Sequence, residues 1–209
     1  MRVAKEGLRF IVPATGLAVV FGITGLGGLG ALFFVLAAAL VFFFRDPDRV
    51  PPAGEHLLVS PADGEVLGVE PVETPPGFDG PATKLTIFLA LYNVHLVRAP
   101  FAATVASAEY HPGRFLPAYK PEAGTHNESR TLVLKSGRLD AVLKMIVGVA
   151  ARRIKCFVQA GEAVERGQRI GLMFFGSRVE LTLPRGASVK VGLHDRVKAG
   201  ETVIAEVQP

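Results

Sequence analysis

A serine that directly follows a glycine stands at the junction of two apolar stretches, within the segment Gly171 to Pro184. Beyond Ser177, apolar residues alternate with polar ones, which is typical of a half-buried β-strand. Glycine adopts backbone conformations that other residues resist, so the Ser177 hydroxyl could attack the carbonyl of Gly176. A Gly-Ser pair is also typical of a tight turn or bulge between two strands. Other residues must decide between these interpretations.

Two further short stretches supply an acid and a base. Asp63 lies in the segment Ser60-Pro61-Ala62-Asp63-Gly64, and His95 is expected at the end of an apolar strand. Taken singly, Asp63 is typical of a turn and His95 of a hydrogen-bonded structural histidine. A histidine that is oriented by a carboxylate and reaches a serine hydroxyl makes a weak nucleophile reactive. Asp63, His95 and Ser177 together therefore suggest a catalytic site.

Short strands must position these residues. From residue 51 to 209 the chain carries apolar or alternating segments that are mostly separated by Gly, Pro or Asp, which predicts a mainly β domain. We expect strands at 57–59, 64–70, 84–91, 102–109, 131–134, 141–149, 155–158 and after 170. The loop 111–127 is long for a compact domain, and such loops are usually functional or disordered.

A weak internal repeat lies near the C-terminus. Val164 to Ile170 and Val197 to Val203 share the pattern V-x-x-G-x-x-(Ile/Val), which predicts a strand, a glycine turn and a second strand in each. Such turns recur in the flattened β-sandwich of biotinyl and lipoyl carrier domains. No lysine stands in the Met-Lys-Met-like context that those carriers modify, so the likeness concerns architecture. We expect a flattened β-sandwich, or barrel-sandwich-like, catalytic domain.

Residues 1–50 differ from the rest of the chain. No charged residue occurs between Phe10 and Phe44, and one straight helix of that length would reach about 50 Å. The hydrocarbon core of a bilayer is only about 30 Å thick. Glycines within 25–30 therefore predict an apolar helical hairpin, with helices near 10–23 and 31–44. Basic residues flank both ends, which places both on the cytoplasmic side; a buried hairpin in a soluble protein is the alternative.

Composition excludes several function classes. Lys and Arg number 23 against 19 Asp and Glu, without the basic run that nucleic-acid binding needs, and this mild excess suits an anionic lipid surface better. Cys156 is alone, which excludes a disulfide framework and indicates a reducing compartment. No histidine pair has the spacing of a metal site, so we expect no metal. His56 and His194 are expected to be surface residues.

The three stretches, in this order and with these neighbours, resemble the phosphatidylserine decarboxylase family of pyruvoyl-dependent enzymes, above all its short prokaryotic members with a membrane hairpin. The likeness begins at Phe44-Arg45-Asp46-Pro47 and reaches the C-terminus. Its most specific parts are Phe175-Gly176-Ser177 and Asn93-Val94-His95. Arg178 stands where many members have threonine. Tyr92 stands where longer bacterial members have a second histidine, so the resemblance leaves the proton donor to the substrate carbon unassigned.

The resemblance implies a self-processing enzyme. Asp63 would orient His95, and His95 would deprotonate Ser177, whose oxygen attacks the carbonyl of Gly176. The proenzyme would be cut between 176 and 177 into chains 1–176 and 177–209, and Ser177 would become the pyruvoyl cofactor. That group would form a Schiff base with phosphatidylserine, and loss of carbon dioxide would yield phosphatidylethanolamine in phospholipid biosynthesis.

The implied partners are phosphatidylserine in the membrane, the two cleavage chains bound to each other, and further copies in a homo-oligomer, with no nucleic acid. The implied location is the cytoplasmic face of the bacterial inner membrane. The loop 111–127 mixes apolar and cationic groups and could cover the lipid headgroup. Candidate substrate-binding residues are Tyr92, Arg114, His126 and Asn127.

Other function classes stay open on the residues alone. A membrane-tethered carrier or adaptor of barrel-sandwich type would keep the chain whole, although the carrier lysine is missing. A serine hydrolase using Asp63, His95 and Ser177 would keep the serine, although the G-x-S-x-G elbow is missing. A pyruvoyl decarboxylase with another amine substrate is the closest variant.

Overall fold

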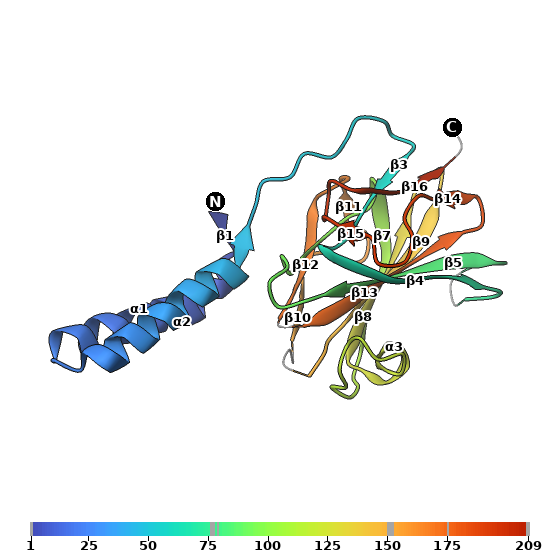
Figure 1. Cartoon of the computed structure of the whole chain (residues 1–209). Coiled ribbons are helices and arrows are strands. Elements are labelled where there is room, and N and C mark those ends of the chain that lie inside the picture. The colour runs from blue at the N-terminus through green and yellow to red at the C-terminus, as the bar shows by residue number, and fades with distance from the viewer. Residues whose placement is uncertain (1, 76–77, 79, 150–152, 175, 208–209) are drawn as a thin grey trace. The chain divides into compact units, whose positions relative to one another are not determined.

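The computed structural model describes all residues except 1, 76–77, 79, 150–152, 175 and 208–209 (Figure 1). Phe175, part of the motif singled out above, therefore lies outside the described residues. The chain divides into two compact units, Met1–Asp48 and Arg49–Pro209. Each unit is described by itself.

The first unit is a hairpin of two antiparallel helices, α1 (Lys5–Ile23) and α2 (Gly27–Phe43), as predicted (Figure 1). Two short strands, β1 (Arg2–Val3) and β2 (Arg45–Asp46), pair at its base. By length and composition α1 can cross a membrane, whereas α2, with 17 residues, is shorter. The helices expose many large apolar side chains, among them Val12, Ile23, Leu32, Phe34 and Val35. An apolar outer surface of this kind suits a lipid environment.

Both helices begin earlier than predicted. Of the glycines expected in the turn, only Gly25, with φ +82°, lies there, because α2 already begins at Gly27. Helical hydrogen bonds satisfy the backbone in apolar surroundings, which favours continuing a helix through glycine. Gly30 also has a packing reason, since a Cβ at this position would lie 3.0 Å from the backbone nitrogen of Gly22. The glycine lets the two helices approach closely.

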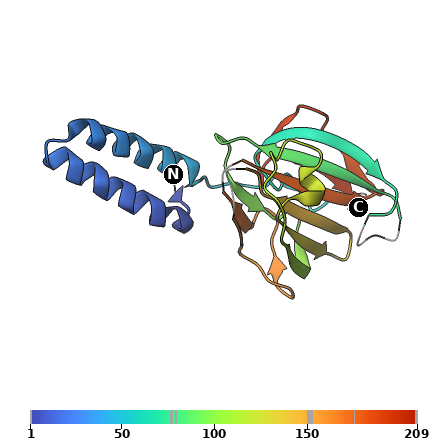
Figure 2. The ribbon, with the colours of Figure 1, turned by 90° about the horizontal axis from the view of Figure 1, so that it is seen from below.

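The second unit consists of antiparallel sheets around one apolar core (Figures 1 and 2). The largest sheet has the strand order β11-β7-β8-β9-β13-β5-β4-β15, and two smaller sheets have the orders β10-β12-β6 and β14-β16-β3. The elements are β3 (Leu57–Val59), β4 (Gly64–Val72), β5 (Ala82–Leu89), β6 (Leu96–Arg98), β7 (Ala103–His111), α3 (Ala123–His126), β8 (Ser129–Lys135), β9 (Asp140–Ile146), β10 (Ile154–Cys156), β11 (Ala163–Val164), β12 (Arg169–Met173), β13 (Ser177–Pro184), β14 (Ala187–Val189), β15 (Arg196–Val197) and β16 (Val203–Val207).

Strand β13 lies in the middle of the large sheet, between β5 and β9. Its apolar residues Val179, Leu181 and Leu183 are fully buried in the core, as their alternation predicted. The predicted mainly β, sandwich-like architecture is confirmed.

The two arms of the large sheet repeat each other. From its middle, the sheet reads β9-β8-β7-β11 in one direction and β13-β5-β4-β15 in the other. The pairing of β4 with β5 shifts between Val66 and Gly68, and the pairing of β7 with β8 shifts between Val105 and Ser107. The seven strands β6 to β12 are thus arranged like the seven strands β3, β4, β5, β13, β14, β15 and β16. In the sequence, the first set lies between β5 and β13 of the second. The unit is an internal duplication.

The predicted glycine turns belong to this duplication. Gly167, with φ +80°, lies in the turn between β11 and β12, and Gly200, with φ +75°, lies between β15 and β16. The Gly167 amide donates to the carbonyl of Ala99, and the Gly200 amide donates to the carbonyl of Ser60, each at 2.8 Å. The weak sequence repeat is therefore the visible part of a larger structural repeat.

Candidate active site

Ser177 is the first residue of β13 and pairs with Leu89 of β5. The preceding Gly176 has φ +65°, a left-handed conformation that favours glycine. Ser177 is fully buried, and its Oγ has no hydrogen-bond partner among the residues that the structure describes. Leaving a buried hydroxyl unsatisfied is unfavourable, so this arrangement calls for a chemical reason.

His95 lies directly before β6, not at the end of an apolar strand as predicted. Strand β5 ends at Leu89, and a turn follows in which the Ala90 amide donates to Oδ1 of Asn93 at 2.9 Å. Sequence periodicity missed this turn because the residues around it are apolar. The buried β6 that follows is only three residues long, too short to show a period.

The two ring nitrogens of His95 face different backbone groups. Nδ1 lies 3.0 Å from the carbonyl oxygen of Asn93, and Nε2 lies 3.2 Å from the amide nitrogen of Gly176. A carbonyl accepts and an amide donates, so these contacts assign the proton to Nδ1 and the lone pair to Nε2. An imidazole lone pair therefore faces the residue that precedes Ser177. This is the form that a general base requires.

The carbonyl oxygen of Gly176 lies against Gly148, in the segment after β9. A methyl group on Gly148 would overlap this oxygen, and it would also lie 3.2 Å from Cβ of Ala118. Only glycine leaves room for the Gly176 carbonyl in this position. Sequence reasoning missed Gly148, because nothing in its local pattern distinguishes it from other glycines near strand ends.

Asp63 lies in the turn between β3 and β4. Its Oδ2 accepts a hydrogen bond from Nη2 of Arg49 at 3.0 Å, and its Oδ1 accepts one from the Ala199 amide at 2.8 Å. Arg49 also donates to Glu201 at 2.7 Å. This buried network connects the carboxylate to the glycine turn between β15 and β16. The role of Asp63 in orienting His95 stays a prediction.

A pocket of about 240 Å³ lies beside Asp63. Tyr92, a predicted substrate contact, lines this pocket and is 61% exposed. Arg196 and Lys198 line it as well, and sequence reasoning missed both, because isolated cations on the surface carry no pattern. The lining residues are Asp63, Gly64, Glu65, Phe88, Ala90, Tyr92, Asn93, Arg196, Val197 and Lys198.

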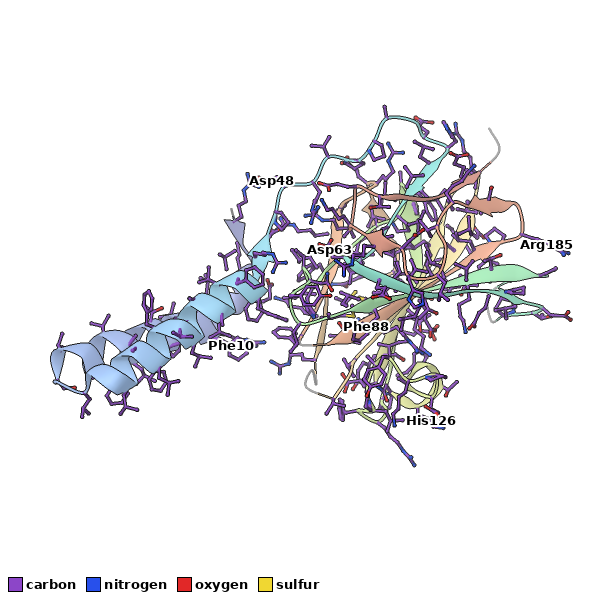
Figure 3. All side chains as sticks on the ribbon, viewed as in Figure 1. Phe10, Asp48, Asp63, Phe88, His126 and Arg185 are labelled. Carbon is purple, nitrogen blue, oxygen red and sulfur yellow. The ribbon has the colours of Figure 1, made fainter. Side chains whose placement is uncertain are left out.

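The other predicted substrate contacts lie in the loop between β7 and β8. Asn127 is buried, and its Nδ2 donates to the carbonyls of Leu116 and Val147, each at 2.7 Å. Its Oδ1 accepts from the Leu116 amide at 2.9 Å, so the side chain braces the loop. Arg114 forms an isolated β-bridge with Asn127, and His126 is exposed on α3, far from Asp63 in Figure 3. Substrate binding by these three residues stays a prediction.

Arg178 fastens this loop to the strand that begins with Ser177. The Arg178 side chain is buried and forms an ion pair with Glu180 at 2.7 Å. Its Nη1 donates to the carbonyl of Lys120 at 3.1 Å, and Nζ of Lys144 donates to the carbonyl of Gly124 at 2.7 Å. The loop is therefore held against the sheet. Sequence reasoning placed Arg178 on a polar strand face and did not foresee these contacts.

Two further histidines were predicted to be surface residues. His56 and His194 are exposed, as predicted, and Nδ1 of His194 lies 2.7 Å from Oε1 of Glu65. Within the described ranges, no group of three or more His, Cys, Asp or Glu residues is arranged to hold a metal ion.

Comparison with known proteins adds a finding that covers nearly the whole chain. The family model for phosphatidylserine decarboxylase matches residues 36–205. The phosphatidylserine decarboxylase proenzyme of Burkholderia mallei (strain SAVP1) is 39% identical over 206 residues, which cover 98% of this chain and 95% of the relative. The proenzyme of Burkholderia ambifaria (strain MC40-6) is 39% identical over 207 residues, which cover 99% of this chain and 96% of the relative.

Proposed function

Because the chain belongs to the phosphatidylserine decarboxylase family, we propose that it converts phosphatidylserine into phosphatidylethanolamine and carbon dioxide after cutting itself between Gly176 and Ser177. One observation carries the self-cleavage: the buried, unpartnered hydroxyl of Ser177 follows a left-handed Gly176 whose amide contacts Nε2 of His95. The hydroxyl thus directly follows the carbonyl that it would attack, and the proposed base contacts the same glycine through its amide; acyl transfer needs these three groups.

In the proposed cleavage, Ser177 Oγ attacks the carbonyl carbon of Gly176 and transfers its proton to Nε2 of His95. The bond between the Gly176 carbon and the Ser177 nitrogen breaks, and the proton on His95 goes to that nitrogen, which leaves an ester. Loss of the Ser177 α-proton then breaks the bond between Cβ and Oγ, and chain 1–176 leaves as a carboxylate. Water replaces the nitrogen of the resulting dehydroalanine, and ammonia departs. The new head of chain 177–209 is a pyruvoyl group.

The pyruvoyl group would supply an electron sink for decarboxylation of the substrate amine. The chain's own residues would bind and orient the substrate. Asp63, one of the proposed site residues, lines a pocket that could hold part of it. Gly148 packs against the Gly176 carbonyl, and Ala118 lies close to Gly148. Burial of Ser177 would keep the reactive group away from bulk water.

The two chains would stay associated after the cut. Strand β13 pairs with β5 along eight residues and with β9 along five. Strands β15 and β16 add pairings with β4 and β3. All of these partners belong to chain 1–176, so backbone hydrogen bonds and the shared core hold chain 177–209 in place.

The helical hairpin gives the proposed reaction a location. A lipid substrate stays in the bilayer, and the apolar surface of α1 and α2 suits insertion there. Basic residues at both ends of the hairpin favour the cytoplasmic face of the inner membrane. The relatives are named proenzymes, a name that implies a cut to form the active enzyme, whereas a carrier or a serine hydrolase would need no cut.

The intact mass of the purified, detergent-solubilised chain under denaturing conditions tests this proposal. We expect two species, one ending at Gly176 and one that begins with pyruvoyl in place of Ser177. Incubation with phosphatidylserine should release carbon dioxide. A single full-length species that retains serine and decarboxylates phosphatidylserine would contradict self-cleavage and require another cofactor.

A further inference from the structure

The pocket beside Asp63 is lined by two cations and two carboxylates. Arg196 and Lys198 line the pocket and are exposed, and no ion pair joins either side chain to a carboxylate in the described part of the chain. The pocket's acids are engaged elsewhere, because Asp63 binds Arg49 and Glu65 lies 2.7 Å from His194. Arg196 and Lys198 are thus two cations at one pocket without an ion-pair partner among the described residues, and such groups can bind an anionic ligand.

Both cations stand on well-defined backbone. Arg196 belongs to β15 and pairs with Glu65 of β4. The Lys198 amide donates to Oγ1 of Thr202 at 2.9 Å, and the Lys198 carbonyl accepts from the Thr202 amide at 3.0 Å. A rigid backbone reduces the conformational entropy that is lost when a site binds a ligand. Arg196 on strand β15 and Lys198 in the turn after it therefore have a well-defined backbone beside the pocket.

The duplication shows that the fold itself does not require cations here. Strand β11 pairs with β7 as β15 pairs with β4, and the register places Ala163 at the position of Arg196. Two residues further on, Glu165 corresponds to Lys198. The repeat without the Gly-Ser pair therefore has a neutral and an acidic residue at these positions. At these two positions, positive charge occurs only in the repeat that carries Ser177.

We propose that Arg196 and Lys198 bind the phosphodiester of the lipid headgroup, an inference that rests on the proposed function. The pocket lies beside the strand that pairs with the Ser177 strand, since Phe88 and Ala90 line it and flank Leu89, the partner of Ser177. Cations suit both anions of the headgroup, its phosphate and its carboxylate. Cations that held the carboxylate would stabilise the charge that decarboxylation removes, which opposes catalysis. The phosphate is therefore the anion that these side chains bind.

Two substrates that differ in the phosphate test this assignment. One is phosphatidylserine in mixed detergent micelles, and the other is O-octanoylserine, which keeps the amine, the carboxylate and an acyl chain but has no phosphate. In the double variant Arg196→Gln, Lys198→Gln, we expect KM for phosphatidylserine to rise about tenfold or more, because a charged hydrogen bond is lost at each position. Turnover of O-octanoylserine should not change. Intact mass should show complete cleavage, as for the wild-type chain.

The control variant is Arg185→Gln, which removes one charge from an exposed turn far from Asp63 (Figure 3). We expect it to leave both substrates unaffected, which separates a pocket contact from general attraction to anionic micelles. An unchanged KM for phosphatidylserine in the double variant, or an equal loss of activity with both substrates, would overturn the phosphate assignment. Cleavage and activity of the wild-type chain would still support the proposed function in that case. A wild-type chain that is uncut and inactive would overturn both.

Discussion

The duplicated domain contains the same structural position twice, and only one copy carries reactive groups. The strand pairings show which residues correspond in the two copies. Phe88 pairs with Glu65 and Arg178, just as Lys135 pairs with Thr104 and Asp140. Arg178 therefore corresponds to Asp140, and the residues that precede Arg178 correspond to those that precede Asp140. Likewise, the carbonyls of His95 and His56 accept equivalent hydrogen bonds from Met173 and Val207. The serine site consists of Asp63, His95, Gly176 and Ser177, and the counterpart site consists of Ala102, His56, Arg138 and Leu139.

The two sites differ in packing as well as in chemistry. The serine site buries Ser177 and His95, whereas the counterpart site opens into a pocket of about 430 Å³ lined by Arg138 and Leu139. Arg138 forms an ion pair with Glu55 at 3.0 Å there. The same strands and turns thus support one site that buries Ser177 and His95 and another whose Arg138 lines a larger pocket. The side chains at four positions, not the scaffold, distinguish the two.

The largest effect that we expect comes from removing the nucleophile. Ser177→Ala should leave folded chain that is uncut and inactive, because no hydroxyl remains to attack Gly176 and no pyruvoyl group can form. Leu139→Ser, which puts a hydroxyl at the counterpart site, should produce no cut after Arg138, because a hydroxyl alone lacks the glycine and the acid. Intact mass after expression measures both outcomes. A cut that persists in Ser177→Ala would exclude Ser177 as the nucleophile.

A smaller but still large effect should separate the two histidines. His95→Ala removes the base beside Gly176 and should slow self-cleavage about a hundredfold or more. His56→Ala, the matched change at the counterpart site, should mature like the wild-type chain, because His56 is exposed and forms no hydrogen bond with Gly176 or Ser177 within the described part of the chain. The measurement is the cut fraction over time after cell-free synthesis. Equal rates in the two variants would refute the role of His95.

The smallest of the three effects concerns two glycines. Gly148 stands two residues after β9, and Gly186 stands two residues after β13. A methyl group at 148 would overlap the Gly176 carbonyl, whereas one at 186 would meet no atom within 4 Å. Gly148→Ala should therefore displace the scissile carbonyl and slow the cut about tenfold or more, and Gly186→Ala should not. The same time course distinguishes them, and normal cutting by Gly148→Ala would contradict this packing role.

Much of the fold was predictable because it depends on local patterns. The apolar run and its glycines predicted the hairpin, and alternation predicted most strands, including β13. The missed elements, β1, β2, β6 and α3, are two to four residues long, too short for a period to be detected. The helix starts were wrong by several residues, because charged residues and glycines that were expected before each helix lie within it.

The sequence by itself determined which residues are available for chemistry: a Gly-Ser pair at a strand junction, one histidine and one acid in recognisable neighbourhoods. Tertiary structure alone decided the rest. It turned Nε2 of His95 toward Gly176, set Gly148 against the scissile carbonyl, and joined Asp63 to Arg49. It also revealed the duplication, since repeated backbone pairings leave little trace in side chains. Contacts between residues far apart in the chain depend on packing, and no local pattern records them.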